Sequence, residues 1–103
     1  MEKTEGKVIF PVGDIVEGKA TNAWLTERLT NLFGGLTVTE GLGFWKDPLD
    51  GAVVSEKVRI YTVAGMPHES YVLQNVAVEL CQRSKESYIY VKRFDGEVYL
   101  SKC

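Results

Sequence analysis

Two amphipathic helical patterns, separated by strand patterns, constrain the fold of this chain more than any other feature. The first pattern has the i, i+4, i+7 and i+8 spacing of one helical face: Leu25, Leu29, Leu32 and Phe33. The second forms a similar stripe: Val72, Leu73, Val76, Ala77 and Leu80. Each apolar stripe has to be buried against another layer, so the sequence predicts helices packed on strands.

The residues around the two stripes indicate where the helices begin and end. Thr21 or Asn22 is expected to cap the first helix, because both side chains accept hydrogen bonds from a first helical turn. Gly34 is expected to end it in a left-handed conformation. The second helix is expected to start near Pro67 and to close by Ser87.

Strand patterns fill the rest of the chain. The apolar run from Lys7 to Gly13 is interrupted by a proline that suits the edge or end of a strand. The segments "LTVT" and "KVRIYTVAG" alternate with a period of two, and "KDPLDG" between them predicts a turn. The segment "YIYVKRFDGEVYLSK" contains two runs joined by Asp95 and Gly96, a pair typical of a type I′ hairpin.

The resulting order, βαββαβ with a possible C-terminal hairpin, predicts a ferredoxin-like α+β fold: an antiparallel sheet with two helices packed on one face. Residues 1–103 are expected to form a single domain, because this length suits one core. The uncovered sheet face is then available for a ligand or a second subunit.

Composition excludes several classes of partner and site. The net charge of −2 leaves no large basic face for DNA or RNA, and no apolar run reaches the roughly 18 residues that span a bilayer. The chain opens without a signal-peptide pattern, so Cys81 and Cys103 are expected to be free thiols of a cytosolic protein. No spacing suggests a metal site, and no cofactor is expected.

Catalytic chemistry is also poorly represented. His68 is the single histidine, it lacks an evident partner, and the role expected for it is a solvated helix cap. A nucleotide hydrolase is therefore a disfavoured alternative, and the sequence predicts a protein that is not an enzyme.

The segment from Gly41 to Trp45 joins two glycines to two large aromatic residues. It follows a strand without opening a helix, so the dinucleotide-binding fingerprint is rejected. Gly41 and Gly43 indicate either a β-bulge or bend, or a place where a ligand or neighbouring chain approaches the backbone closely. In the second interpretation Phe44 and Trp45 provide the flat surface.

Other aromatic and cationic residues could contribute to a binding surface. Tyr88 and Tyr90 share one face of a strand and are expected to be only partly buried. Arg93 is the preferred anion binder, because its planar guanidinium matches a phosphate; the alternative is an ion pair with Asp95 or Glu97 within the hairpin.

The segments "FGGLTVTEGLGFW" and "DGAVVSEKVRIYTVA", within residues 33–64, resemble small phage proteins of the first anti-Thoeris family. A family of uncharacterised bacterial proteins shows a similar order of GGLTV, tryptophan and acidic residues. The resemblance implies a non-enzymatic sponge that sequesters a cyclic ADP-ribose isomer, or a cyclic di- or trinucleotide, in the cytoplasm of an infected bacterial host. It also implies a dimer or a hexamer.

By the same resemblance, a base is stacked on an aromatic ring and the phosphates are held by an asparagine and arginines. The candidate ligand-binding residues are Arg93, Asn75, Tyr61, Trp45, Phe44 and Arg59. The stacking ring is either Tyr61 or Trp45. A structural, self-assembling protein is the main alternative to nucleotide binding.

Overall fold

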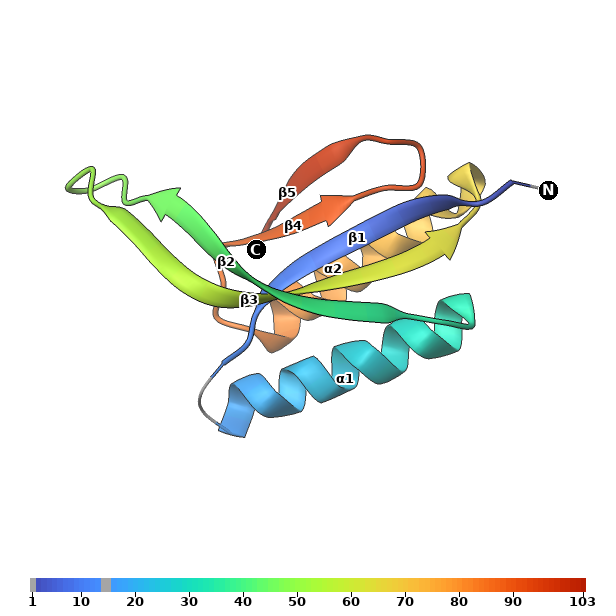
Figure 1. Cartoon of the computed structure of the whole chain (residues 1–103), viewed down its shortest axis with the longest axis horizontal. Coiled ribbons are helices and arrows are strands. Elements are labelled where there is room, and N and C mark those ends of the chain that lie inside the picture. The colour runs from blue at the N-terminus through green and yellow to red at the C-terminus, as the bar shows by residue number, and fades with distance from the viewer. Residues whose placement is uncertain (1, 14–15) are drawn as a thin grey trace.

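The computed structural model describes residues 2–13 and 16–103 and has two layers. One layer is a five-stranded antiparallel sheet, and the other consists of two helices on one of its faces (Figure 1). The predicted α+β fold class is confirmed.

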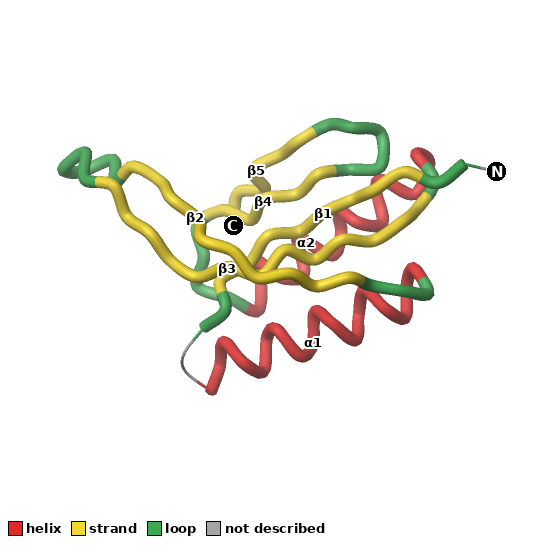
Figure 2. The backbone as a smooth tube through the Cα atoms, viewed as in Figure 1, coloured by secondary structure: helices red, strands yellow, loops and turns green. Residues whose placement is uncertain are grey.

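The sheet has the strand order β2-β3-β1-β4-β5. Its strands are β1 (Thr4–Pro11), β2 (Thr37–Lys46), β3 (Val53–Gly65), β4 (Tyr88–Lys92) and β5 (Val98–Lys102). The first four strands have the order expected for a ferredoxin-like sheet, and β5 adds a short edge strand beside β4. In Figure 2 the strand tubes show β2 at the opposite edge, next to β3.

The helices are α1 (Val16–Phe33) and α2 (Ser70–Arg83), and a 3₁₀ turn, Pro67–Glu69, precedes α2. Gly34 ends α1 as predicted, with φ of 78° and its N–H donating to Thr30 O at 2.8 Å. The predicted start of α1 is wrong. Asn22 lies inside the helix, and its amide donates to the carbonyls of Pro11, Val12 and Gly18 at 2.9 to 3.0 Å.

Strand β2 continues through both glycines without interruption. Its pairing with β3 runs one residue to one, from Thr37 opposite Thr62 to Lys46 opposite Val53. The predicted bulge at Gly41 or Gly43 is therefore wrong, because a bulge would place two residues opposite one.

The loop of the last hairpin is longer than the predicted two-residue type I′ turn. Asp95 does not have positive φ, whereas Gly96 has φ of 88°, so the turn is not type I′. Gly96 N–H donates to Arg93 O and Arg93 N–H donates to Glu97 O, at 3.0 and 2.8 Å. These bonds describe a β-turn followed by one left-handed glycine, a common longer hairpin loop.

The core lies between the sheet and the helices. Alternation along β1, β3 and β4 sends one set of side chains toward the helices, where the residues are buried: Val8, Phe10, Tyr61, Val63, Ile89 and Val91. They pack on apolar residues of α1 and α2: Leu25, Leu29, Leu73, Val76, Ala77 and Leu80. We call the opposite, helix-free side of the sheet the open face.

The cysteines form a disulfide rather than free thiols. Cys81, near the end of α2, is bonded to Cys103, which follows β5, and their Cα atoms lie 5.0 Å apart. The prediction of free thiols is wrong because the fold brings together two residues that lie 22 positions apart in the sequence. The bond attaches the edge strand β5 to the helix layer.

Strands β2 and β3 extend beyond the rest of the sheet. Pairing of β1 with β3 covers Val58–Gly65, so the preceding part of β3 is paired with β2 alone. We call this projecting hairpin, residues 42–57, the arm; it reaches away from the helices in Figure 1. Among the described residues, no helix has the length and apolarity needed to cross a membrane.

Candidate functional site

The six predicted ligand-binding residues lie in four separate places. Tyr61 is fully buried on the helix-facing side, where its hydroxyl donates to Asn22 Oδ1. No part of its ring is exposed to a ligand. Arg59 faces the same side of β3, and its Nε lies 3.8 Å from a carboxylate oxygen of Glu40. Asn75 is exposed on α2.

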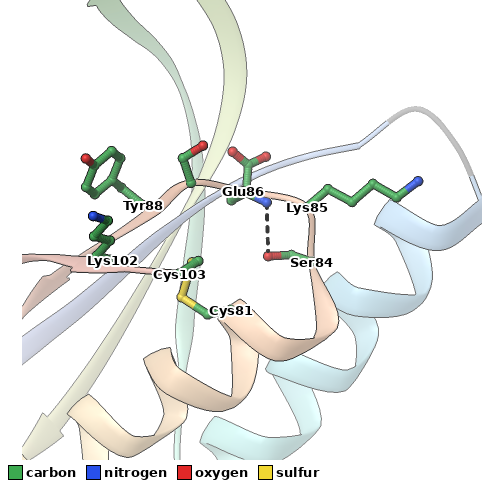
Figure 3. Close-up of a pocket in the computed structure, with 8 residues that line it drawn as sticks. Cys81, Ser84, Lys85, Glu86, Tyr88, Lys102 and Cys103 are labelled. Atoms are coloured by element: carbon green, nitrogen blue, oxygen red, sulfur yellow. Dashed lines mark hydrogen bonds between the residues drawn. A yellow bond between two sulfur atoms is a disulfide. The ribbon is translucent and has the colours of Figure 1, made fainter.

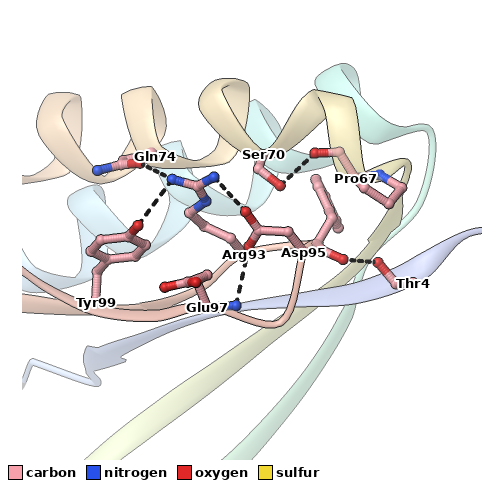
Figure 4. A network of polar contacts seen from close by, with 9 residues as sticks. Thr4, Pro67, Ser70, Gln74, Arg93, Asp95, Glu97 and Tyr99 are labelled. Atoms are coloured by element: carbon pink, nitrogen blue, oxygen red, sulfur yellow. Dashed lines mark hydrogen bonds and ion pairs between the residues drawn. The ribbon is translucent and has the colours of Figure 1, made fainter.

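Arg93 is held inside its own hairpin (Figure 4). Its guanidinium donates to Gln74 Oε1 at 3.1 Å and to the Tyr99 hydroxyl at 3.3 Å, and it pairs with Asp95 at 2.5 Å. A hydrogen bond from the Glu97 backbone N–H, and then Arg93 itself, lower the pKa of Asp95. The ion pair is the alternative that the sequence left open, and it occupies the nitrogens expected to hold phosphate.

The remaining two candidates belong to the arm. Trp45 and Phe44 are 44% and 66% exposed, and they point to opposite sides because they are consecutive in a strand. Trp45 shares the open face with Gly41 and Gly43. The structure therefore separates the two aromatic residues and leaves Trp45 on the side where the sheet is uncovered.

An acidic residue that the sequence analysis missed lies next to these glycines. Glu56 of β3 is opposite Gly43 of β2, and both lie on the open face. Burial and then the charge of Glu86 raise the pKa of Glu56 above its ordinary value of 4.5. Glu86 belongs to the loop that precedes β4. A perturbed carboxyl group on an uncovered face is a common feature of functional sites.

The lack of side chains at Gly41 and Gly43 leaves space above β3. A Cβ atom at Gly43 would lie 3.2 Å from Val58 Cγ1, and one at Gly41 would lie 3.6 Å from Ile60 Cδ1. Glycine thus keeps this strip of the open face flat, with Glu56 along it. This finding supports the second interpretation of the two glycines, in which they allow close approach to the backbone.

A concavity of about 520 Å³ adjoins Glu86 (Figure 3). Tyr88 and Lys102, which are opposite each other on β4 and β5, line it together with Glu86 and the disulfide. Tyr88 is 55% exposed, whereas Ile89 beside it is buried, as the alternation in the sequence predicted. We define the candidate site by Trp45, Glu56, Glu86, Tyr88 and Lys102.

The site combines two carboxylates, one ammonium group and two exposed aromatic rings. Carboxylates accept hydrogen bonds from hydroxyl and ammonium groups, and the rings offer stacking surfaces. Two carboxylates repel a phosphate, so the arrangement suits a ligand that carries a flat ring and a positive charge better than a nucleotide polyphosphate. His68 lies exposed at the 3₁₀ turn and is not part of this set. Within residues 2–13 and 16–103, no group of three or more His, Cys, Asp or Glu side chains could hold a metal ion.

No protein-family model matches the sequence, and no curated protein does. Two solved structures share the fold. One is a phage SAM lyase in complex with S-methyl-5′-thioadenosine, with a TM-score of 0.67 and 16% identity over 98% of this chain and 90% of that chain. The other is a phage SAM lyase in the apo state, with a TM-score of 0.67 and 14% identity over 100% of this chain and 95% of that one.

These two structures bear on the expected lack of enzymatic activity and on the expected phage origin and small-molecule ligand. Both are lyases and therefore enzymes, which contradicts the prediction that a chain of this kind is not an enzyme. Both are phage proteins, and one of them holds a small adenosine-containing molecule, so the comparison agrees with the expected phage origin and small-molecule ligand in general terms. The likeness to the first anti-Thoeris family stays a prediction.

Proposed function

We propose that this protein is an enzyme that binds S-adenosylmethionine (SAM) on the open face and breaks it to release S-methyl-5′-thioadenosine. One observation carries the proposal: the partly buried Glu56 carboxyl group, with its raised pKa, lies on the uncovered face of a sheet whose whole fold resembles that of a phage SAM lyase. The low identity leaves the substrate to be tested directly.

The groups of SAM have counterparts in the candidate site. The adenine ring can stack on Tyr88 or Trp45, both of which expose part of their rings. The ribose hydroxyls and the ammonium group can donate to Glu56 and Glu86, and the substrate carboxylate can pair with Lys102. SAM carries no phosphate, so the acidic character of the site does not oppose its binding.

Release of S-methyl-5′-thioadenosine requires one bond to break, between the sulfonium sulfur and Cγ of the methionine-derived chain. The electron pair of that bond stays on sulfur, which loses its positive charge. The carboxylate of the same substrate molecule attacks Cγ and forms a C–O bond, giving a five-membered lactone, so atoms and charge balance without water. Opposite charges cancel as the reaction proceeds, and a weakly polar surface such as Val58 and Ile60 favours that change over bulk water.

An assay of the purified protein with SAM tests the proposal. Purified protein is incubated with SAM, and the products are separated and identified by mass spectrometry. We expect S-methyl-5′-thioadenosine and the lactone to accumulate well above the no-enzyme reaction. Glu56→Gln is expected to lower the rate by about 100-fold or more, because binding and positioning groups contribute on this scale.

Glu27→Gln is the matched control. Glu27 is an exposed carboxylate on α1, and α1 covers the side of the sheet opposite the open face. It should retain the wild-type rate. If wild-type protein leaves SAM intact under conditions in which it is folded, the proposal is wrong.

A second candidate is binding of a cyclic nucleotide such as a cyclic ADP-ribose isomer, as the sequence resemblance implies. The exposed rings of the site favour it, since adenine is common to both ligands. A thermal-shift comparison separates the two: a ligand at 100 times its dissociation constant stabilises the folded protein by about 2.7 kcal/mol. Stabilisation by the cyclic nucleotide, with none by SAM or S-methyl-5′-thioadenosine, would support this second candidate.

A further inference from the structure

The outer edge of β2 is a long unpaired strand edge. β2 contributes ten residues, Thr37–Lys46, and the order of the sheet places no strand of residues 2–13 or 16–103 beyond it. The opposite edge, β5, has five residues and is tied to α2 through the disulfide. Natural proteins usually shorten, bend or cover such an edge, because its free N–H and C=O groups pair readily with another strand. β2 contains no proline or bulge that would prevent pairing.

Backbone direction shows which residues of β2 offer these groups. Asp47 N–H donates inward to Ala52 O at 2.8 Å, and the direction of N–H and C=O groups alternates along an antiparallel strand. Residues of odd number in β2 therefore bond to β3. The outward groups belong to the even-numbered residues: Val38, Glu40, Leu42, Phe44 and Lys46.

In one antiparallel register, the side chains of these residues in one copy of β2 are complementary to those in a second copy. When two copies of β2 pair antiparallel about Gly43, Glu40 of each copy lies opposite Lys46 of the other, and Leu42 lies opposite Phe44. Residues 42 and 44 are then a hydrogen-bonded pair, as the outward groups require. Leu42 and Phe44 are 63% and 66% exposed in the single chain, so this pairing would cover both.

The same register accounts for the two glycines. Trp45 of one copy lies opposite Gly41 of the other in a non-hydrogen-bonded pair, where side chains come closest. An aromatic ring lying across a glycine on a neighbouring strand restores the packing that glycine lacks. Shifting the register by two residues in either direction separates Glu40 from Lys46 and Trp45 from Gly41.

We propose that two copies of this chain associate through antiparallel pairing of their β2 edges, centred on Gly43, into one continuous ten-stranded sheet. A two-fold axis perpendicular to the sheet keeps the helices of both copies on the same side, because paired residues share a face. The pairing forms about eight backbone hydrogen bonds between the copies. The inference concerns the sheet edge and does not depend on the proposed activity.

A charge exchange tests the register. The oligomeric state is measured by sedimentation velocity across a dilution series from high micromolar to nanomolar concentration. Wild-type protein is expected to be a dimer that dissociates on dilution. E40K places two pairs of like charges in the interface and should raise the dimer dissociation constant by about tenfold or more, and K46E should act in the same way.

The double variant E40K/K46E restores opposite charges in both pairs and is expected to return the dissociation constant to within about threefold of wild type. Hydrogen exchange gives a second reading that does not depend on charge. The amides of Leu42 and Phe44 should become protected as the concentration rises, whereas those of Gly41 and Gly43, already bonded to β3, should not change. A wild-type protein that is monomeric throughout, or a dimer that is insensitive to E40K and to K46E, would overturn the proposal.

Discussion

At the scale of single residues, the Glu56 carboxyl group lies in surroundings that disfavour its charged form. Burial is the larger cause and the charge of Glu86 the smaller one, and both raise its pKa above 4.5. The folded chain therefore holds this proton more tightly than the unfolded chain does. As the pH rises from the unfolded pKa through the folded pKa, the free energy of unfolding falls, and it stays lower above that range.

Glu56→Gln removes this titration. We expect the variant to gain stability relative to wild type as the pH rises from about 4 to about 8, while the two proteins become similar at the acidic end. Urea denaturation at a series of pH values measures the difference. The free energy of unfolding of Glu27→Gln should stay within about 0.5 kcal/mol of wild type at each pH. If the difference between Glu56→Gln and wild type does not change with pH, the raised pKa of Glu56 is contradicted.

Individual roles were predictable from the sequence only where they depend on local spacing. The partial exposure of Tyr88 followed from alternation along one strand, and the ion pair of Arg93 with Asp95 was one of two stated alternatives. Glu56 was missed because its neighbours come from β2 and from the loop before β4. The sequence did contain one signal: Glu56 interrupts an otherwise apolar stripe on one face of β3, formed by Val54, Val58 and Ile60.

At the scale of elements, β5 is held in place by its pairing with β4 and by a disulfide. In the part of the chain that the structure describes, β5 pairs with β4 alone, and the Cys81–Cys103 disulfide joins the residue after β5 to α2. A short edge strand with few neighbours is expected to fray unless it is attached elsewhere. The disulfide supplies that attachment, and it closes a loop between residues 22 positions apart.

Loss of the disulfide should therefore lower stability. For a loop of this length, Cys103→Ser is expected to reduce the free energy of unfolding by about 3 kcal/mol. Thermal unfolding with and without dithiothreitol measures the effect: wild type should melt at a lower temperature in the reductant, and Cys103→Ser should be unaffected by it. Equal melting temperatures for oxidised and reduced wild type would show that the bond does not stabilise β5.

The type and order of the elements followed from sequence periodicity, whereas their boundaries did not. The helical stripes and the alternating "KVRIYTVAG" segment identified α1, α2 and β3, because each pattern repeats within its own element. The start of α1 was placed too late because Asn22 resembles a helix cap, yet its amide bonds to the carbonyls of the preceding loop. The disulfide and the uninterrupted pairing of β2 with β3 depend on contacts that no local pattern encodes.

At the scale of the whole molecule, one buried polar group joins the two layers. Asn22 of α1 is 1% exposed; it donates to Pro11 and Val12 at the end of β1 and accepts from the Tyr61 hydroxyl of β3. A helix, two strands and the connection between them thus meet at one amide. Removal of that amide leaves buried donors and acceptors without partners, which is more costly than losing the bonds alone.

Asn22→Ala is accordingly expected to reduce the free energy of unfolding by about 3 kcal/mol or more. Equilibrium urea denaturation provides the measurement. Asn31→Ala is the matched control on the same helix, because Asn31 is exposed, and it should change stability by no more than about 0.5 kcal/mol. Similar effects of the two substitutions would mean that the amide network does not join the layers.

The central position of β1 has a consequence for synthesis on the ribosome. β1 is synthesised before its two neighbours, β3 and β4, which begin at Val53 and Tyr88. The backbone N–H and C=O groups of β1 therefore have no strand partners on both sides until most of the chain has been translated. Contacts of such long sequence separation form slowly, because the intervening chain has to be closed first. During that time the apolar residues of β1 stay accessible to chaperones, and a ribosome that stalls before Tyr88 leaves a nascent chain whose sheet lacks a strand on one side of its centre.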